Sequence, residues 1–458
     1  MILTQKIQIR KLSKQDYLFL KQMCKDSKNF YNSVLYITRQ HFFNNGEFLG
    51  MYARHNLVKQ LPETQRMKSD VAAHIQLRID WAFRSFFALK KKQKSGDYHC
   101  KVKMPHYLPK DGYYHIYLSP KSFNFTDTYF YFHPSKQVCR ENNLKTNYKI
   151  KISFKKQFKG KIKQVAIIQH NNAQYFELAI TYEHDESKTN LNLDKSNLLS
   201  IDCGLDNFAT CLDCQSGRSF ILDGRELKSI NRWWNKQTAK LKTVYIKHKN
   251  SLKKKGVELE KSSKRLIRLT QQRKNQINNY LNQMVSYIIK YCAQKDIGTI
   301  IIGDWSSEIK QSIKLGKINN QNFVQIPFAN FKQKLKHKCQ IYGLELIFQD
   351  ESYTSKCSFL DEEYPEKHTT YLGKRIHRGL FGTSKGTLIN ADVNGAANIA
   401  IKSKQGSNGK FAIARLSSGF TSNPKRIRLP DFERSGVKMS ELVAYVANKQ
   451  KQTSLEVA

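Results

Sequence analysis

The sequence of 458 residues predicts a multidomain α/β protein with two different halves. Residues 105–185 contain several short runs rich in aromatic and β-branched residues, which is typical of a small β-barrel or sheet. From residue 198 onward, short apolar runs alternate with amphipathic stretches, the pattern of an α/β domain. Hydrophobic residues make up 40% of the chain, which is enough to bury a sizeable core.

The first half is expected to be a β domain with a helical insertion. Lys6–Arg10 alternates polar and apolar residues, which predicts a strand with one buried face. Residues 14–103 lack clear turn signals and are expected to be helical. Their core candidates are Leu18, Met23, Phe30, Leu35, Ile79, Trp81 and Phe86. Further strands are expected at 113–118, 128–132, 148–154 and 165–182, the last broken by a hairpin signal at 170–173.

The second half follows a polar linker at 187–196. Strands are expected at 198–201, 220–222, 300–302 and 344–348, with a long lysine-rich helical stretch over 225–295 and helices at 328–342 and 394–402. Gly343 is the expected stop of the helix before it.

The charge of the chain predicts a polyanionic partner. Lys and Arg number 78 and Asp and Glu 37, a formal net charge of +41. A field of that size attracts polyanions and makes their binding depend strongly on salt. A solvated basic surface without a partner and an anionic membrane are the alternatives. The sequence has no apolar run of ~18 residues and no signal peptide, so nucleic acid is expected rather than a membrane.

Three carboxylates stand where a sheet passes into a loop or helix. Asp202 and Glu351 each follow an apolar strand run, and Asp392 opens a helical segment. In open α/β sheets, functional residues collect beyond the carboxyl ends of strands. Hard oxygen ligands suit Mg²⁺ or Mn²⁺, and two ions ~3.5–4 Å apart can activate water and stabilise a leaving oxygen. Any one of these residues alone is best interpreted as a solvated surface carboxylate. The three together, in a strongly basic chain, predict a metal-dependent nuclease.

Several segments resemble the TnpB family and its eukaryotic and viral relatives, called Fanzor; the type V CRISPR effectors are more distant kin. The segment Ile201-Asp-Cys-Gly-Leu-Asp-Asn-Phe-Ala-Thr210 resembles the first motif of the RuvC-like nuclease domain, and 390–399 resembles the last. Residues 231–241, 323–328, 351–361 and 373–379 match the same family. The resemblance runs over almost the whole chain and is weakest at 40–190 and after 430.

The resemblance implies an RNA-guided DNA endonuclease with an RuvC/RNase H-like domain. A transposon-derived guide RNA would pair with double-stranded target DNA beside a short adjacent motif, with one protein per guide RNA. Asp202, Glu351 and Asp392 would hold Mg²⁺. The expected location is intracellular: the nucleus for a eukaryotic Fanzor, otherwise the cytoplasm or nucleoid. The implied domains are a split wedge β-barrel (1–12 and 104–190), a helical recognition domain (13–103), a RuvC-like domain (191–351 and 389–405), a target-nucleic-acid-binding segment (352–388) and a C-terminal tail (406–458).

One departure from the family pattern concerns the second carboxylate. The common TnpB pattern has a Glu where this sequence has Gly303, at the end of the strand at 300–302. Glu351 ends the strand expected beside it, and a glycine leaves space for a longer neighbouring side chain. A relocated glutamate of this kind is known in Fanzor proteins and some TnpB lineages. Asp304, Glu308 and a nuclease-dead site are the alternatives.

A second departure concerns zinc. Many relatives carry two Cys-x-x-Cys pairs between the second and third acidic motifs, but this sequence has only Cys357 there. His368 and His377 are further possible ligands, yet a structural zinc site needs four, so no zinc is expected. The pair Cys211 and Cys214 stands alone and is interpreted as part of a hairpin.

Nucleic-acid contacts are predicted from basic and aromatic residues. Lys356, Lys374, Arg375 and Arg378 are candidates for phosphate contacts near the cleavage site, with an ordinary basic loop as the alternative. Trp233 and Trp234 are adjacent on a helix, so we expect one in the core and one as a partly exposed stacking residue.

Two other functions remain open on the sequence. A nuclease-dead, RNA-guided DNA-binding repressor would share every feature except cutting, whereas a strand-joining transposase lacks a Tyr or Ser nucleophile context. Pro424–Arg428 also has the composition of a nuclear import signal.

Overall fold

The computed structural model describes residues 1–126, 128–153, 160–185, 189–254, 263–304, 325–403 and 423–428, together with Asp431 and Val446. The chain divides into two compact units, Met1–Asp185 and Glu186–Ala458, and each is described by itself. In the described residues no helix is both long and apolar enough to span a bilayer.

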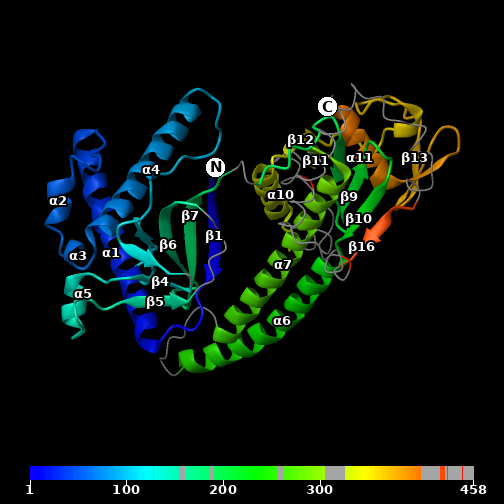
Figure 1. Ribbon diagram of the computed structural model, residues 1–458. Coiled ribbons are helices and arrows are strands. Elements are labelled where there is room, and N and C mark those ends of the chain that lie inside the picture. The colour runs from blue at the N-terminus through cyan, green and yellow to red at the C-terminus, as the bar shows by residue number, and fades with distance from the viewer. Residues whose placement is uncertain are drawn as a thin grey trace, which may run out of the picture. The chain divides into compact units, whose positions relative to one another are not determined.

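The first unit is built on two antiparallel sheets (Figure 1). The larger has the order β1-β7-β6-β2, formed by β1 (Ile2–Gln8), β7 (Tyr175–Glu183), β6 (Ile162–His170) and β2 (Ile116–Leu118). The smaller contains β3 (Phe123–Phe125), β4 (Tyr129–Phe132) and β5 (Ile150–Ser153). The short helix α5 (Lys136–Glu141) connects β4 to β5. Strand β1 pairs with β7 along its whole length, so the N-terminal strand completes the sheet as the sequence predicts.

The helical insertion comprises α1 (Lys14–Asn45), α2 (His55–Lys59), α3 (Pro62–Gln65) and α4 (Ser69–Lys94). Helix α1 begins after Ser13, whose side chain accepts a hydrogen bond from the Asp16 amide, and ends at Gly46 in the left-handed conformation (φ 71°). Among the predicted core residues, Phe30, Leu35 and Ile79 are fully buried.

Two of the core predictions in this insertion are wrong. Leu18 is 53% exposed and Trp81 is 46% exposed. Helix α1 buries Phe19 and Leu20 instead of Leu18, because the face that meets the sheet is offset from the one that spacing alone suggested. The Trp81 ring is covered on one side by the Arg78 guanidinium, 4.9 Å from its centroid, rather than by the core.

The second unit contains a mixed six-stranded sheet with the order β12-β11-β8-β9-β10-β16. Its strands are β8 (Leu198–Asp202), β9 (Asn207–Asp213), β10 (Ser219–Asp223), β11 (Thr299–Asp304), β12 (Glu345–Asp350) and β16 (Lys425–Ile427). Strands β8, β11 and β12 run parallel, and β9 is antiparallel to β8 and β10. The carboxyl ends of β8, β11 and β12 therefore lie at one edge of the sheet.

Helices cover this sheet and extend from it. Helices α6 (Arg225–Lys254) and α7 (Lys264–Lys295) run side by side, and α10 (Phe328–Tyr342) packs against α7 (Figure 1). Gly343 ends α10 in the left-handed conformation (φ 76°), as predicted. Helix α11 (Ala391–Lys402) packs across β8, β9 and β11 through Val393, Ala396, Ala397 and Ile399, all fully buried.

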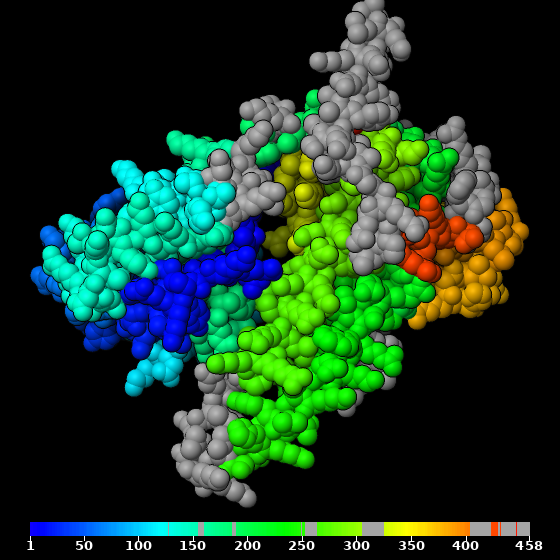
Figure 2. Space-filling view, turned by 60° about the horizontal axis from the view of Figure 1, so that its bottom comes forward, coloured from blue at the N-terminus to red at the C-terminus, as the bar shows by residue number. Residues whose placement is uncertain are grey.

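The remaining described segments of the second unit contain short elements only. Residues 352–390 contain the 3₁₀ turn η2 (Phe359–Asp361) and a small sheet of β13 (Lys374–His377), β14 (Leu380–Gly382) and β15 (Leu388–Asn390). Strand β16 comes from the segment 406–458 that was expected to be a tail, and it pairs in parallel with β10. Figure 2 shows this strand, in red-orange, on the surface of the unit beside green and orange segments.

Candidate functional site

The three predicted carboxylates come from three elements of the second unit. Asp202 is the last residue of β8, and Glu351 directly follows β12. Strand β11 lies between these two strands, in register with both. Asp392 is in the first turn of α11, which packs on β8. The sheet order and the helix thus bring residues 202, 351 and 392 to the same edge.

Glu351 occupies the space beside Gly303. A Cβ atom built on Gly303 would lie 1.9 Å from Oε1, 2.5 Å from Cδ and 2.6 Å from Cγ of Glu351. A side chain at position 303 and the present position of the Glu351 side chain therefore exclude each other. This arrangement agrees with the expectation that a glycine at 303 admits a carboxylate from the neighbouring strand.

A second glycine makes room for Asp202. A Cβ atom on Gly395 of α11 would lie 2.8 Å from Asp202 Oδ2, closer than ordinary packing allows. The helix backbone can therefore approach the end of β8, and this approach places Asp392, three residues earlier on the helix, near Asp202.

Electrostatic repulsion links Asp202 to each of the other two carboxylates. Burial raises the pKa of Asp202, and the nearby charge of Asp392 raises it further. Burial also raises the pKa of Glu351, with a further contribution from Asp202. Divalent cations relieve such repulsion, and carboxylate oxygens are the ligands that Mg²⁺ and Mn²⁺ prefer. The donor set therefore fits a hard divalent metal.

Two cations and an amide border the carboxylates. Asn207 Nδ2 donates to Asp392 Oδ2 over 2.5 Å, and Arg375 Nη2 lies 3.4 Å from Asp392 Oδ1. Lys332 Nζ donates to Asp304 Oδ1 over 2.8 Å and to the Gly303 carbonyl. Asn390 caps α11 by accepting from the Asp392 amide over 3.0 Å, which fixes the start of the helix. The sequence analysis missed Lys332 and Asn207, although Asn207 lies inside the first quoted motif.

The alternatives for the second carboxylate differ from Glu351 in their surroundings. Asp304 is held in an ion pair by Lys332, and its side chain is 45% exposed. Glu308 lies outside the described residues.

The predicted phosphate-contact residues differ in their surroundings: the two arginines pair with acidic residues, whereas the two lysines do not pair with the three carboxylates. Arg375 contacts Asp392, and Arg378 forms an ion pair with Asp206. Lys356 lies 6.0 Å from the Tyr353 ring centroid and 5.7 Å from that of Tyr371. Lys374 is exposed on β13. All four belong to the segment 352–390 that follows Glu351.

The two tryptophans differ in exposure, but neither lies in the core, where one of them was predicted. Trp233 is 41% exposed, whereas Trp234 is half-buried beneath the Arg273 guanidinium, 4.7 Å from its ring centroid. Arg273 also donates to Asn231 over 2.7 Å, so the cation is fixed against α6. Trp233 therefore has the more accessible ring of the two.

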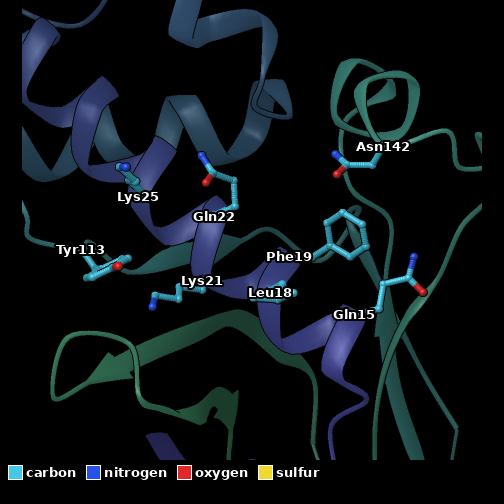
Figure 3. A pocket seen from close by; sticks show the side chains of 8 residues that line it. All are labelled: Gln15, Leu18, Phe19, Lys21, Gln22, Lys25, Tyr113 and Asn142. Atoms are coloured by element: carbon cyan, nitrogen blue, oxygen red, sulfur yellow. The ribbon is translucent and has the colours of Figure 1, made fainter.

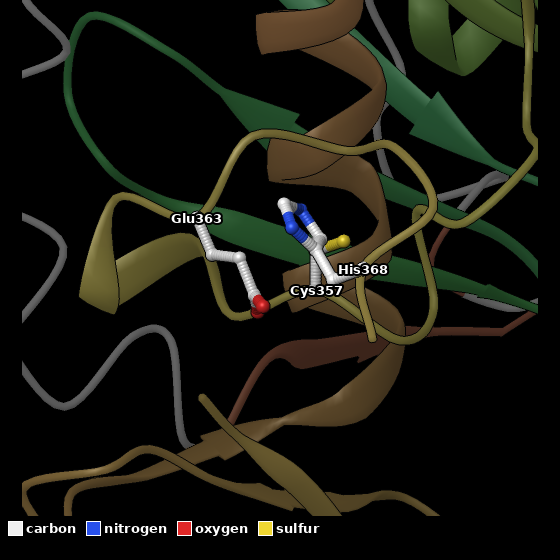
Figure 4. Close-up of side chains that lie close together, drawn as sticks. All are labelled: Cys357, Glu363 and His368. Atoms are coloured by element: carbon white, nitrogen blue, oxygen red, sulfur yellow. The ribbon is translucent and has the colours of Figure 1, made fainter. Parts of the chain in front are cut away.

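Cys357 lies in the one group of three possible metal ligands found among the described residues (Figure 4). The other two are Glu363 and His368, with all three ligand atoms within 4.8 Å of one another; His377 is not in the group. Asp202, Glu351 and Asp392 are not part of this group.

The Cys357 group does not fit a structural zinc site. Each Glu363 oxygen accepts a hydrogen bond from a backbone amide: Oε2 from Ser358 over 2.8 Å and Oε1 from Leu372 over 3.2 Å. His368 Nε2 lies 2.8 Å from the Tyr364 carbonyl, and Cys357 Sγ donates to the Glu366 carbonyl. Burial raises the pKa of the Cys357 thiol, which disfavours the thiolate that zinc binds. Three mixed donors that already have protein partners differ from the four ligands of a closed zinc site. Cys211 is buried in β9, and Cys214 directly follows this strand, in agreement with a hairpin position.

The first unit contains a surface hollow of about 570 Å³ (Figure 3). Helix α1 contributes six residues to its lining, and Tyr113 and Asn142 complete it; the six are Gln15, Leu18, Phe19, Lys21, Gln22 and Lys25. The lining contains two cations and no carboxylate, so the hollow favours an anionic or polar ligand.

Comparisons with known proteins agree with this geometry. The OrfB_IS605 family model, described as "Probable transposase", matches residues 179–308, and the Cas12f1-like TNB domain matches residues 328–399. The TnpB-like protein ORF457 of Acidianus two-tailed virus is 22% identical over 413 residues, covering 84% of this chain and 83% of that protein.

A solved structure shares the fold. It is a cryo-EM structure of a Cas12f1-sgRNA-target DNA complex, with a TM-score of 0.54 and 14% identity, covering 85% of this chain and 83% of the Cas12f1 chain. The mixed α/β architecture described above belongs to the same class of fold as this solved structure. The two family models, the viral relative and the shared fold are together consistent with the TnpB family.

Proposed function

We propose that the protein is an RNA-guided DNA endonuclease that cuts double-stranded DNA beside a short adjacent motif. Asp202, Glu351 and Asp392 bind two divalent ions, Mg²⁺ by preference. These ions activate water and stabilise the leaving oxygen of the cut phosphodiester. The guide RNA comes from the transposon that encodes the protein, and one protein binds one guide RNA.

The position of Glu351 carries the proposal. A carboxylate fills the space beside Gly303, next to Asp202, where the family pattern has a glutamate on β11. Loss of the family glutamate with nothing in its place would have favoured a dead site.

The charge and the surfaces support nucleic-acid partners. The formal net charge is +41, and the lining of the hollow on the first unit has no acidic residue. Lys356 and Lys374 are not paired with the three carboxylates and remain candidates for phosphate contacts beside the site. The solved relative with the shared fold was imaged with a single guide RNA and target DNA.

The test uses protein co-expressed with its own flanking genomic DNA. The copurifying RNA is sequenced, and the complex is then incubated with a plasmid library that carries the matching target beside randomised bases, in Mg²⁺ and in EDTA. We expect cuts that require Mg²⁺ and that lie beside one enriched motif.

Glu351→Gln provides the decisive variant, with Glu345→Gln as its control. Both replace a carboxylate by an amide at nearby positions of one chain segment, but Glu345 is exposed at the start of β12. The first should abolish cutting and preserve target binding, and the second should preserve both. Target binding without any cut by the wild-type complex would instead identify a nuclease-dead repressor, and absence of bound RNA would refute the guided mechanism.

A further inference from the structure

A line of polar side chains connects the C-terminal strand to the third carboxylate. Arg426 of β16 donates from Nη2 to Asn207 Oδ1 over 2.7 Å, and Asn207 donates from Nδ2 to Asp392 Oδ2 over 2.5 Å. The arginine accepts no hydrogen bonds, so the Asn207 carbonyl oxygen must face Arg426 and its amide nitrogen must face Asp392. The contact with Arg426 therefore fixes the orientation of the Asn207 side chain.

The backbone around Asn207 explains why its side chain points toward Asp392. Leu222 of β10 pairs with Ala209, but the next residue, Asp223, pairs with Asn207, so the register shifts by one residue at this point. A bulge of this kind changes the direction of a side chain at the end of a strand and is often found beside a functional site.

Arg426 is itself held on its other side. Its Nη1 lies 3.5 Å from Asp223 Oδ1, while Arg225 donates from Nη2 to the other oxygen of Asp223 over 2.7 Å. Strand pairing of Arg426 with Ile221 sets the position of its backbone. The guanidinium therefore donates a hydrogen bond to Asn207 and pairs with the charge of Asp223 at the same time, which the single ammonium group of lysine reproduces poorly.

We infer that Asn207 and Arg426 form a positioning relay that orients the Asp392 carboxylate for metal binding, so that strand β16 is part of the nuclease centre. The inference rests on the proposed function. Asn207 holds Oδ2 of Asp392 with a neutral donor, and Oδ1, which lies 3.4 Å from Arg375 Nη2, is the oxygen that would turn to a metal ion. Side chains that hold a metal ligand in this way commonly change metal affinity by about 10–100-fold when they are removed.

The test compares Asn207→Ala, Arg426→Lys and Asp392→Ala in the full-length chain. Mn²⁺ binding to the protein is counted by electron paramagnetic resonance, and the Mg²⁺ dependence of cutting is measured on the guide-RNA complex. Asp392→Ala should lose the site. Asn207→Ala should weaken Mn²⁺ binding and raise the Mg²⁺ concentration for half-maximal cutting by about 10-fold or more, with a smaller loss at saturating Mg²⁺. Arg426→Lys should shift both in the same direction by a smaller factor.

Lys425→Ala serves as the matched control, because it removes an exposed cation next to Arg426 on the same strand. This variant should leave both the Mn²⁺ binding curve and the Mg²⁺ dependence of cutting unchanged. Melting temperatures within a few degrees of wild type show that the variants fold, and Arg426→Lys tests the relay even if Asn207→Ala does not fold. Unchanged Mn²⁺ affinity in both relay variants would overturn the inference. Normal Mn²⁺ binding by a wild-type complex that never cuts would refute the proposed function. In that case the Mn²⁺ affinities of Asn207→Ala and Arg426→Lys would still test whether these residues orient Asp392.

Discussion

The side chain of Glu351 lies where a side chain on Gly303 would have to be, with Oε1 1.9 Å from the position of a Cβ atom on that glycine. The two residues belong to neighbouring parallel strands, and Gly303 pairs with Gln349, two residues before Glu351. One residue thus lacks a side chain so that the other can reach the site.

Gly303→Ala should impair cutting although it removes no carboxylate. The new methyl group displaces the Glu351 side chain, and a metal ligand moved by about 1 Å can cost roughly 10²-fold in rate. The measurement is the single-turnover cleavage rate of the guide-RNA complex. Gly50→Ala is the control, since a Cβ there would meet only Phe48 Cε1 at 3.9 Å. Equal rates for Gly303→Ala and wild type would contradict the proposed role of Glu351.

The double variant Gly303→Glu with Glu351→Ala should recover part of the activity that Glu351→Ala loses. Truncation at 351 removes the atoms that a side chain at 303 would meet, and the new glutamate extends from the middle strand toward Asp202. Recovery is read as cleavage by the double variant above that of Glu351→Ala, in the same preparation and at the same Mg²⁺ concentration. Gly303→Glu with Glu351 intact should stay inactive because the two side chains compete for one space.

The raised pKa values of Asp202 and Glu351 make the metal-free protein less stable as pH rises. The folded state holds protons that the unfolded state has lost above about pH 4, so the free energy of unfolding falls until the raised native pKa values are passed. Glu351→Gln should therefore raise the melting temperature in EDTA by about 2 °C or more near pH 8, with a smaller gain near pH 5.

Mg²⁺ should reverse this trend, because the ion replaces the protons that the carboxylates hold. Cutting at limiting Mg²⁺ should accordingly increase with pH over the same range. The paired measurements are melting curves and cleavage rates, with Glu345→Gln as the control for the loss of one negative charge. A stabilisation by Glu351→Gln that is independent of pH would contradict the pKa argument.

Glu363 should stabilise the segment 352–390 without zinc. Its carboxylate accepts hydrogen bonds from the Ser358 and Leu372 amides. Glu363→Ala leaves both backbone donors unsatisfied, which lowers the free energy of unfolding by roughly 1–3 kcal/mol for each donor. We expect a lower melting temperature for Glu363→Ala, a small effect for His368→Ala, and no zinc in mass-spectrometric metal analysis of the wild-type protein. Stoichiometric zinc, lost in Cys357→Ser and His368→Ala, would show that the group is a metal site after all.

Arg54 should be necessary for the fold of the first unit. It is fully buried, forms a 2.7 Å ion pair with Asp80, and donates to the Gln76 and Leu49 carbonyls. Arg54→Ala leaves Asp80 buried without its cation, which typically costs about 3–5 kcal/mol. The measurement is chemical unfolding of the full-length protein, with the exposed Lys59→Ala as a control that should unfold at the wild-type denaturant concentration.

Local features of the chain were predictable from the sequence because they depend on neighbouring residues. The hairpin at 170–173 is one example, since Asn171, Asn172 and Ala173 adopt positive φ angles between β6 and β7. The end of α10 at Gly343 is another, since a left-handed residue there closes the last turn. Exposure was less predictable: Leu18 and Trp81 have apolar side chains, but the face that each helix buries depends on what packs against it.

The residues that can supply the chemistry are recognisable in the chain alone: Asp202 and Glu351 at strand ends, Asp392 at a helix start, and a glycine at 303. Which of them meet depends on folding, because strand order joins residues 202, 303 and 351 over a long stretch of chain. Likewise, Arg426 belonged to a segment without a predicted fold until β16 paired with β10 and brought it to Asn207. Periodicity specifies the faces of an element, whereas the partner of each face is set by packing between elements far apart in the sequence.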